Sequence, residues 1–124
     1  MDQILSKEFK FKLCYLSMVN IHNKKANAVV IVVFNVDPNN QQSLIDAAIN
    51  NTEKVMSNKP SFISANFHKS FDKTRVANYA QWEKKEDVEA MFKVPDPKEY
   101  TKQILQISSQ NWGAYKVVYT STNS

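Results

Sequence analysis

The chain has 124 residues, of which 43% are hydrophobic and 23% charged, values typical of one soluble globular domain. Its net charge of +4 is mild, and Arg75 is its only arginine, so the clustered arginines of sequence-specific nucleic-acid binders are missing. We therefore expect no nucleic-acid partner. Gly113 is the only glycine, which excludes the glycine-rich loops that bind the phosphates of NAD, FAD or ATP.

Cysteine and histidine usage sets further limits. Cys14 is the only cysteine, so an internal disulfide is impossible and a cytoplasmic location is the expectation. His22 and His68 are far apart and lie in no HxxxH or CxxC motif, so we predict no metal site. No apolar run approaches the length of a membrane span, so no membrane contact is expected.

The first third of the chain predicts an extension, a strand and a helix. Residues 1–27 form an N-terminal extension in which aromatic and polar residues alternate, as in an extra edge strand or an arm packed on a partner. Residues 28–36, AVVIVVFNV, are β-branched and apolar on both faces, which is typical of a central strand. Asp37 as cap and Pro38 as first residue predict a helix that continues to about Asn58.

Residues 62–82, FISANFHKSFDKTRVANYAQW, predict two strands joined by a turn at Asp72-Lys73. Asn78 and Trp82 are four apart in the second strand and therefore share one face. That face otherwise holds Val76 and Ala80. An amide and an indole on an apolar face predict a pocket for a ligand that is both aromatic and polar.

The remaining elements complete a familiar order. Residues 84–92 predict a second amphipathic helix, which Pro95 ends, and Asp96 with Glu99 forms a capping box that begins a third helical piece. Residues 112–120 predict the last strand, and residues 121–124 a frayed tail. The order β-α-β-β-α-β, with its second helix split, predicts the α+β ferredoxin-like plait: a four-stranded antiparallel sheet with helices on one face.

The strand at 28–36 also predicts an assembly. Val29, Ile31 and Val33 point to one face of the sheet, and alternate apolar residues point to the other. Leaving either set in water forfeits roughly 1.5 to 3 kcal/mol per large side chain, and helices cover only one face. We therefore expect a homodimer that forms through the uncovered face of the sheet.

The runs SANFHKSFDKTRVANYAQW and EKKEDVEAMF resemble the antibiotic biosynthesis monooxygenase domain family. The resemblance covers residues 28–120, taken as the domain, and is most specific over 63–92. It rests on a histidine and a serine before an Asp-led turn, followed by Arg-Val-x-Asn-Tyr-x-x-Trp. The matching positions are His68, Ser70, Asp72, Arg75, Val76, Asn78, Tyr79, Gln81 and Trp82. The resemblance implies a dimeric α+β barrel of two ferredoxin-like subunits.

The resemblance also implies an activity. The best-known members of the family oxidise aromatic polyketide intermediates to quinones with dioxygen, and use no flavin, metal or haem, so no cofactor is expected. Asn78 would hydrogen-bond the carbonyl or phenolate oxygen of a small aromatic or quinol substrate. Trp82 would stack on its ring or orient it. Further substrate contacts are expected from His68, Phe92, Tyr100 and Lys102.

The chain departs from that family in one respect. Oxygenating members also use a tyrosine and an arginine after the motif, whereas no arginine follows Arg75 here, and Tyr100 and Lys102 are the nearest substitutes. A non-catalytic ligand-binding or structural dimer of the same fold is therefore an alternative. An isomerase of small oxygenated metabolites is a second alternative.

The residues themselves leave several roles open. Trp82 is equally suited to filling the core, and Asn78 to bonding a backbone carbonyl in place of a ligand. With the simplest turn, His68 falls on the opposite face from Asn78, at a dimer interface or on the surface. Arg75 suits an ion pair at the surface or at an interface.

Overall fold

The computed structural model describes residues 24–93 and 99–123. The predicted N-terminal strand and the Asp96 end of the capping box lie outside this part of the chain. The elements, in chain order, are β1 (Ala28–Val36), η1 (Pro38–Asn40), α2 (Gln41–Lys54), η2 (Met56–Asn58), β2 (Phe62–Lys69), β3 (Arg75–Trp82), α3 (Lys85–Phe92), α4 (Glu99–Ile107) and β4 (Ser108–Tyr115).

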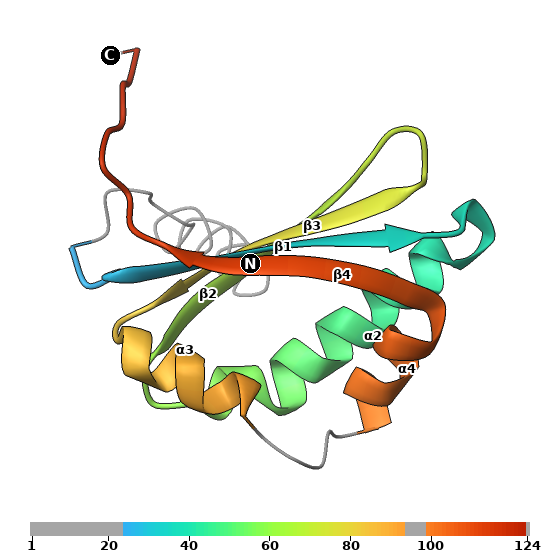
Figure 1. The fold of residues 1–124 in the computed structure, drawn as a ribbon, viewed down its shortest axis with the longest axis horizontal. Coiled ribbons are helices and arrows are strands. Elements are labelled where there is room, and N and C mark those ends of the chain that lie inside the picture. The colour runs from blue at the N-terminus through green and yellow to red at the C-terminus, as the bar shows by residue number, and fades with distance from the viewer. Residues whose placement is uncertain (1–23, 94–98, 124) are drawn as a thin grey trace, which may run out of the picture.

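The four strands form one antiparallel sheet in the order β2-β3-β1-β4. Helices α2, α3 and α4 all lie on the same side of this sheet (Figure 1). The predicted β-α-β-β-α-β order and four-stranded plait are therefore confirmed. The second helix is split into α3 and α4, as its two prolines indicate.

Helix α2 begins as the sequence predicts, but through a 3-10 turn. The side chain of Asp37 accepts a hydrogen bond from the backbone N–H of Asn39 at 2.9 Å, and Pro38 is the first residue of that turn. Gln41, the first residue of α2, is buried and donates its amide to the backbone oxygen of Arg75 at 2.9 Å. This bond ties the start of the helix to the start of β3.

The loop between β2 and β3 is longer than the two-residue turn considered in the simplest register. The side chain of Asp72 accepts hydrogen bonds from the backbone N–H and the hydroxyl of Thr74 and from the hydroxyl of Ser70. Bonding by the Thr74 hydroxyl is the main cause that lowers the pKa of Asp72 to about 2. Lys73 has a φ of 67°, the left-handed conformation that closes the loop.

The last strand is where the sequence prediction was wrong. Strand β4 spans Ser108–Tyr115, so it starts and ends earlier than the predicted residues 112–120. It runs antiparallel to β1 from the pair Val36 and Ser108 to the pair Val29 and Tyr115. Because β1 begins at Ala28, which lies opposite Lys116 in this register, the residues from Val117 onward have no strand left to pair with, despite their β-branched composition.

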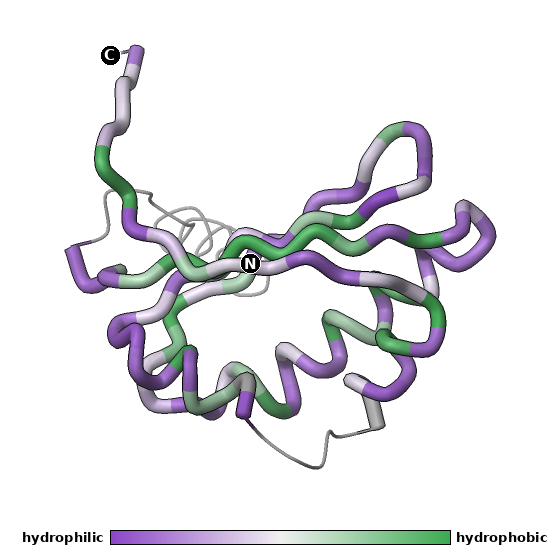
Figure 2. The backbone as a smooth tube through the Cα atoms, in the orientation of Figure 1, coloured by the Kyte–Doolittle hydropathy of each residue, from purple (hydrophilic) through white to green (hydrophobic). Residues whose placement is uncertain are grey.

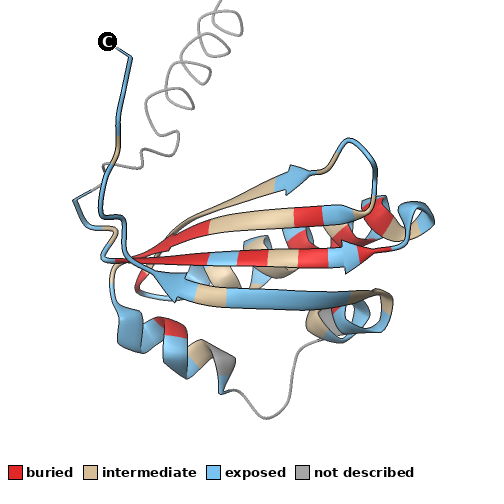
Figure 3. Ribbon diagram, turned by 45° about the horizontal axis from the view of Figure 1, so that its top comes forward, coloured by how far each residue is buried: buried red, intermediate tan, exposed pale blue. Residues whose placement is uncertain are grey.

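The core lies between the sheet and the helices. Figures 2 and 3 show the apolar, buried character of β1 and of the facing part of β3. Leu44 of α2, Val88 of α3 and Ile104 of α4 pack against these strands in one buried cluster. The strand residues of that cluster are Ala28, Val30, Val32, Phe34, Val36, Val76, Ala80 and Trp82. These residues show that Asn78, which alternates with Val76 and Ala80, faces the helices.

No described helix covers the other side of the sheet, which we call the open face. Val29, Ile31 and Val33 of β1 point to it, as predicted from their alternation with core residues. Ile31 is 37% exposed at the centre of this face. None of the described helices is both long and apolar enough to cross a membrane.

Candidate functional site

One row of side chains crosses the helix-facing side of the sheet at Asn78. The strand register pairs Phe67 of β2 with Asn78 of β3, Asn78 with Val32 of β1, and Val32 with Trp112 of β4. These four residues are called the site row. It places an aromatic ring at each end and an amide and an aliphatic side chain between them. Neighbouring strands are about 4.8 Å apart, so the row spans the width of the sheet.

The amide of Asn78 has a defined orientation. Its Oδ1 accepts a hydrogen bond from the backbone N–H of Asn66 at 3.1 Å. A backbone N–H is always a donor, so the atom that faces it must be the oxygen, and the Nδ2 group must point elsewhere. Among the described residues Nδ2 has no hydrogen-bond partner. The alternative in which Asn78 bonds a backbone carbonyl is therefore not what is found, and its two N–H donors remain available.

Trp82 lies on the same side of the sheet but inside the core. It is only 1% exposed, and its ring meets that of Phe62 edge to face, with ring centres 5.4 Å apart. Edge-to-face contacts of this kind stabilise buried aromatic pairs beyond the area that they bury. The structure thus gives Trp82 a packing role, and its predicted contact with a substrate ring stays a prediction.

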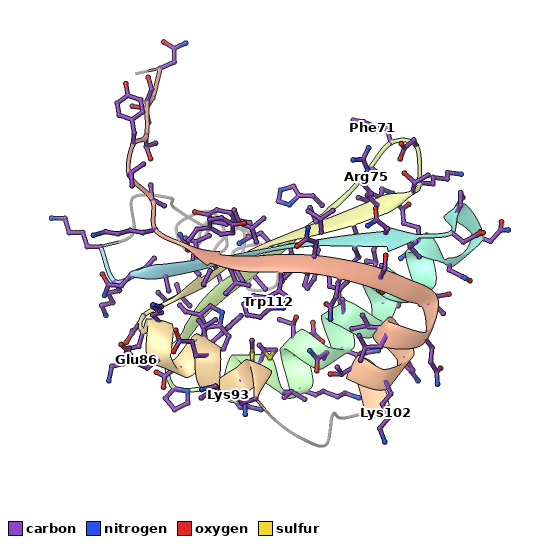
Figure 4. The ribbon with its side chains drawn as sticks, viewed as in Figure 1. Phe71, Arg75, Glu86, Lys93, Lys102 and Trp112 are labelled. Atoms are coloured by element: carbon purple, nitrogen blue, oxygen red, sulfur yellow. The ribbon has the colours of Figure 1, made fainter. Side chains whose placement is uncertain are left out.

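Trp112 is the residue that sequence reasoning missed. It closes the site row on β4, and it is 41% exposed although it faces the helices. Figure 4 shows it beneath β4, on the side of the sheet that carries α3 and α4. The available signal was an aromatic residue in a predicted strand. Without the correct pairing of β4 with β1, its alignment with Asn78 could not be derived.

His68 is not brought to the site row. It pairs with Ala77, so it lies on the open face, opposite Asn78, as the simplest register predicts. Its Nδ1 lies 3.1 Å from the backbone oxygen of Asn66. A substrate bound to Asn78 cannot also contact His68 of the same chain, because the sheet separates them.

The other predicted substrate contacts come from α3 and α4. Lys102 is on the exposed side of α4, and in Figure 4 its side chain points away from the sheet. Phe92 lies in α3 and Tyr100 in α4, but their side chains lie outside what the structure describes. Val88 of α3 is fully buried in the core.

Arg75 makes an ion pair at the surface. Its guanidinium lies 4.0 Å from Asp72, and both side chains are largely exposed. Such pairs contribute little to stability in water. Arg75 therefore belongs to the loop between β2 and β3, and Figure 4 shows it near the end of that hairpin, well away from Trp112.

The described strand residues of the site offer binding and hydrogen-bond donation. Among the strand residues of 24–93 and 99–123 that face the helices, Lys69, exposed at the loop end of β2, is the only ionisable one. No group of three or more His, Cys, Asp or Glu side chains in the same ranges is arranged to hold a metal ion. The amide of Asn78 is thus the polar group of the site row.

Comparison with known proteins decides the family. The family model described as antibiotic biosynthesis monooxygenase matches residues 27–103, more than half of the chain. The chain belongs to the antibiotic biosynthesis monooxygenase family. The resemblance inferred from the hairpin motif is therefore confirmed, and the matched range includes β1, the hairpin, α3 and the start of α4.

Two relatives of this family member are monooxygenases. Over 66 residues it is 41% identical to the tetracenomycin-F1 monooxygenase of Streptomyces glaucescens. The match covers 53% of this chain and 59% of the relative, so this chain spans about three fifths of it. A crystal structure of a monooxygenase from the gene ActVA-Orf6 of Streptomyces coelicolor, in complex with nanaomycin D, is 26% identical with a TM-score of 0.74. That match covers 86% of this chain and 100% of the other.

A third structure supports the fold alone. SnoaB, a cofactor-independent oxygenase from Streptomyces nogalater, is 18% identical with a TM-score of 0.61, over 77% of this chain and 97% of the other.

Proposed function

We propose that the protein is a cofactor-independent monooxygenase that oxidises a small aromatic or quinol substrate with dioxygen. The observation that carries the proposal is the fixed amide of Asn78, whose oxygen is held by the backbone of Asn66 while its nitrogen donors stay unpaired among the described residues. The substrate's carbonyl or phenolate oxygen would accept a hydrogen bond from Nδ2.

The reaction requires a substrate that forms a stable anion. One atom of dioxygen enters the substrate as a carbonyl oxygen, and the other leaves as water with two hydrogens of the substrate. In an anthrone both hydrogens come from the methylene carbon, whereas in a phenol one comes from the ring carbon and one from the hydroxyl. The deprotonated substrate supplies the electrons, so charge that spreads onto its oxygen must be stabilised. A preorganised amide donor does this without reorganisation of water. In a site with few competing polar groups, that stabilisation is larger than in bulk water.

Trp82 would act on this site by positioning. Its ring, packed against Phe62, anchors the end of β3, which also carries Asn78. The apolar neighbours of Asn78 on β3 and β1 would exclude water from the ring of the substrate. The relatives named as monooxygenases support the reaction class, and the identity of the substrate is part of the proposal.

The decisive variant is Asn78→Asp. Aspartate keeps an oxygen that accepts the bond from the N–H of Asn66, but it removes the donor, so the hairpin stays paired while the substrate oxygen meets a carboxylate. We expect oxygen consumption with anthrones, naphthols and quinols to fall about 100-fold or more, the loss typical of one oxyanion donor. Metal-free protein should be used throughout.

Asn66→Ala is the matched control. The side chain of Asn66 faces the open face and donates to the backbone oxygen of Tyr79 at 2.8 Å and to Oγ of Ser64 at 3.3 Å, so its removal disturbs the same hairpin at least as much as Asn78→Asp does. Its backbone N–H, which holds Asn78, is kept. We expect near wild-type turnover in this control. Equal activity of wild type and Asn78→Asp would refute the proposed role of the amide.

A ligand-binding dimer without catalysis is the second candidate. It is favoured by the lack of an ionisable side chain between Phe67 and Trp112 in the described site row, because an oxygenase must transfer a proton. Binding of the same aromatic compounds without any oxygen consumption would establish this candidate. Turnover abolished by Asn78→Asp would exclude it.

We also propose that the protein is a homodimer that associates through the open face. Ile31 is exposed at the centre of this face, and Tyr115, beside it on β4, is 54% exposed. A symmetric partner would cover both of these exposed side chains.

A further inference from the structure

The helix-facing side of β4 differs from that of the other strands. On β1 and β3 nearly every residue on this side is buried, whereas on β4 Gln110, Trp112 and Ala114 are all exposed (Figure 3). Helix α4 precedes β4 and packs mainly on α2. The described helices therefore leave this edge of the sheet uncovered, and a large indole is placed there.

We propose that Trp112 is the residue that stacks on the bound ligand and selects for ligand length. This inference rests on the proposed function only in assuming that an aromatic ligand binds at Asn78. The strand register puts Trp112 in the same row as Asn78, with Val32 between them. Val32 is only 6% exposed under the helices, so a ligand that accepts a hydrogen bond from Asn78 reaches the indole along this row when the helix side chains packed on Val32 move aside for it.

The distance between Asn78 and Trp112 along the row determines how long a ligand must be to contact both. Asn78 and Trp112 are two strands apart, which corresponds to about 9.5 Å between their backbones. A single ring placed against Asn78 is too short to reach Trp112, whereas a linear system of three fused rings is long enough. Trp112 thus contributes to the binding of extended ring systems and contributes little to that of a single ring.

An alternative role for Trp112 is simple packing. A packing role would bury the indole, as it buries Trp82, yet 41% of Trp112 is exposed while only 1% of Trp82 is. Exposed indole surface is costly in water and is recovered when a flat ligand stacks on it. The contrast between the two tryptophans is what separates a core residue from a ligand-binding one.

The experiment measures binding, so that it does not depend on turnover. Anthraquinone-2-sulfonate serves as the three-ring probe and a sulfonated benzoquinone as the one-ring probe, titrated against wild type, Trp112→Leu and Trp112→Phe. We expect Trp112→Leu to bind the three-ring probe roughly tenfold more weakly, with the loss largely restored in Trp112→Phe. Affinity for the one-ring probe should stay within about twofold.

Tyr115→Leu is the control on the same strand. Tyr115 is an exposed aromatic residue on the opposite face of β4, so its loss disturbs the strand without touching the site row. Because that face is the proposed dimer interface, light scattering is used to compare the oligomeric state of Tyr115→Leu with that of the wild type. Equal weakening in Trp112→Leu and Tyr115→Leu, or wild-type affinity in Trp112→Leu, would overturn the inference. Failure of the wild type to bind either probe would overturn it together with the proposed site.

Tryptophan fluorescence adds a second readout. In wild type, the three-ring probe should quench the emission of Trp112, and in Trp112→Phe only the buried Trp82 remains. Quenching that persists unchanged in Trp112→Phe would place the ligand at Trp82 and refute the inference. Binding that depends on Trp112 in a protein that consumes no oxygen would leave this inference standing while removing the proposed reaction.

Discussion

Replacing Trp82 by alanine tests whether this residue acts in the core or on the substrate. The side chain is 1% exposed and packs edge to face on Phe62, so its removal leaves a large cavity. Truncation of a buried tryptophan to alanine costs about 3 to 5 kcal/mol. Small domains have only about 5 to 15 kcal/mol of stability in total. We therefore expect Trp82→Ala to lose a large part of the folded population under ordinary assay conditions.

Trp82→Phe separates the two roles. Phenylalanine keeps a ring against Phe62 but is smaller and lacks the indole N–H, so the cost should be about 1 to 2 kcal/mol. Urea denaturation followed by circular dichroism gives the free energy of unfolding of both variants. Oxygen consumption is then measured per folded molecule. With a positioning role, turnover should follow the folded fraction in both variants.

Two results would refute this reasoning. If Trp82→Ala unfolds within about 1 kcal/mol of wild type, Trp82 is not the core residue that its burial indicates. If Trp82→Phe stays folded but loses turnover as completely as Trp82→Ala, the indole itself contacts the substrate. The second result would restore the role implied by the family resemblance.

Three further predictions concern acid stability, assembly and pH dependence. The pKa of Asp72 is lowered from 3.8 to about 2 in the folded protein, so its contribution to stability is present above pH 4 and is lost as the pH falls through 2. The difference in urea midpoint between wild type and Asp72→Asn should therefore shrink over that range, and a constant difference would contradict this prediction. Ile31→Lys places a charge at the centre of the open face and should give monomers in light scattering, where an unchanged dimer would exclude this interface. The pH dependence of the turnover rate should shift with the acidity of the substrate, because no described ionisable side chain lies within the site row between its aromatic ends. An apparent pKa that stays the same for all substrates would instead reveal a base on the protein.

Most of the fold followed from local sequence signals. The β-branched run of β1, the Asp-Pro start before α2 and the alternation in the hairpin each depend on neighbouring residues alone, and each is found in the structure. The placement of Asn78 and Trp82 on one face followed from the period of a strand. These features are encoded within about ten residues, which is why they could be predicted.

The features that escaped prediction depend on pairing between distant strands. Strand β4 ends at Tyr115 because its partner β1 begins at Ala28, and nothing in the residues after Tyr115 indicates this. The same pairing places Trp112 beside Val32 and so in the row of Asn78. The hydrogen bond from the backbone of Asn66 to Asn78 likewise depends on the register of β2 and β3. The candidate site is thus a product of register, and composition alone could not assemble it.

Given the side chains of the site row, the acidity of the ligand should decide whether the protein oxidises it or only binds it. The described row supplies aromatic surface at Phe67 and Trp112 and a donor at Asn78, but no base among those residues. A donor that stabilises an anion lowers the pKa of a bound phenol or anthrone, so under the proposed function a ligand that is already acidic would ionise in the site and react with dioxygen. A ligand of ordinary phenol acidity stays neutral and is only bound. Oxygen consumption across a series of ligands of similar shape should therefore rise with their acidity, whereas their affinities should follow their stacking area.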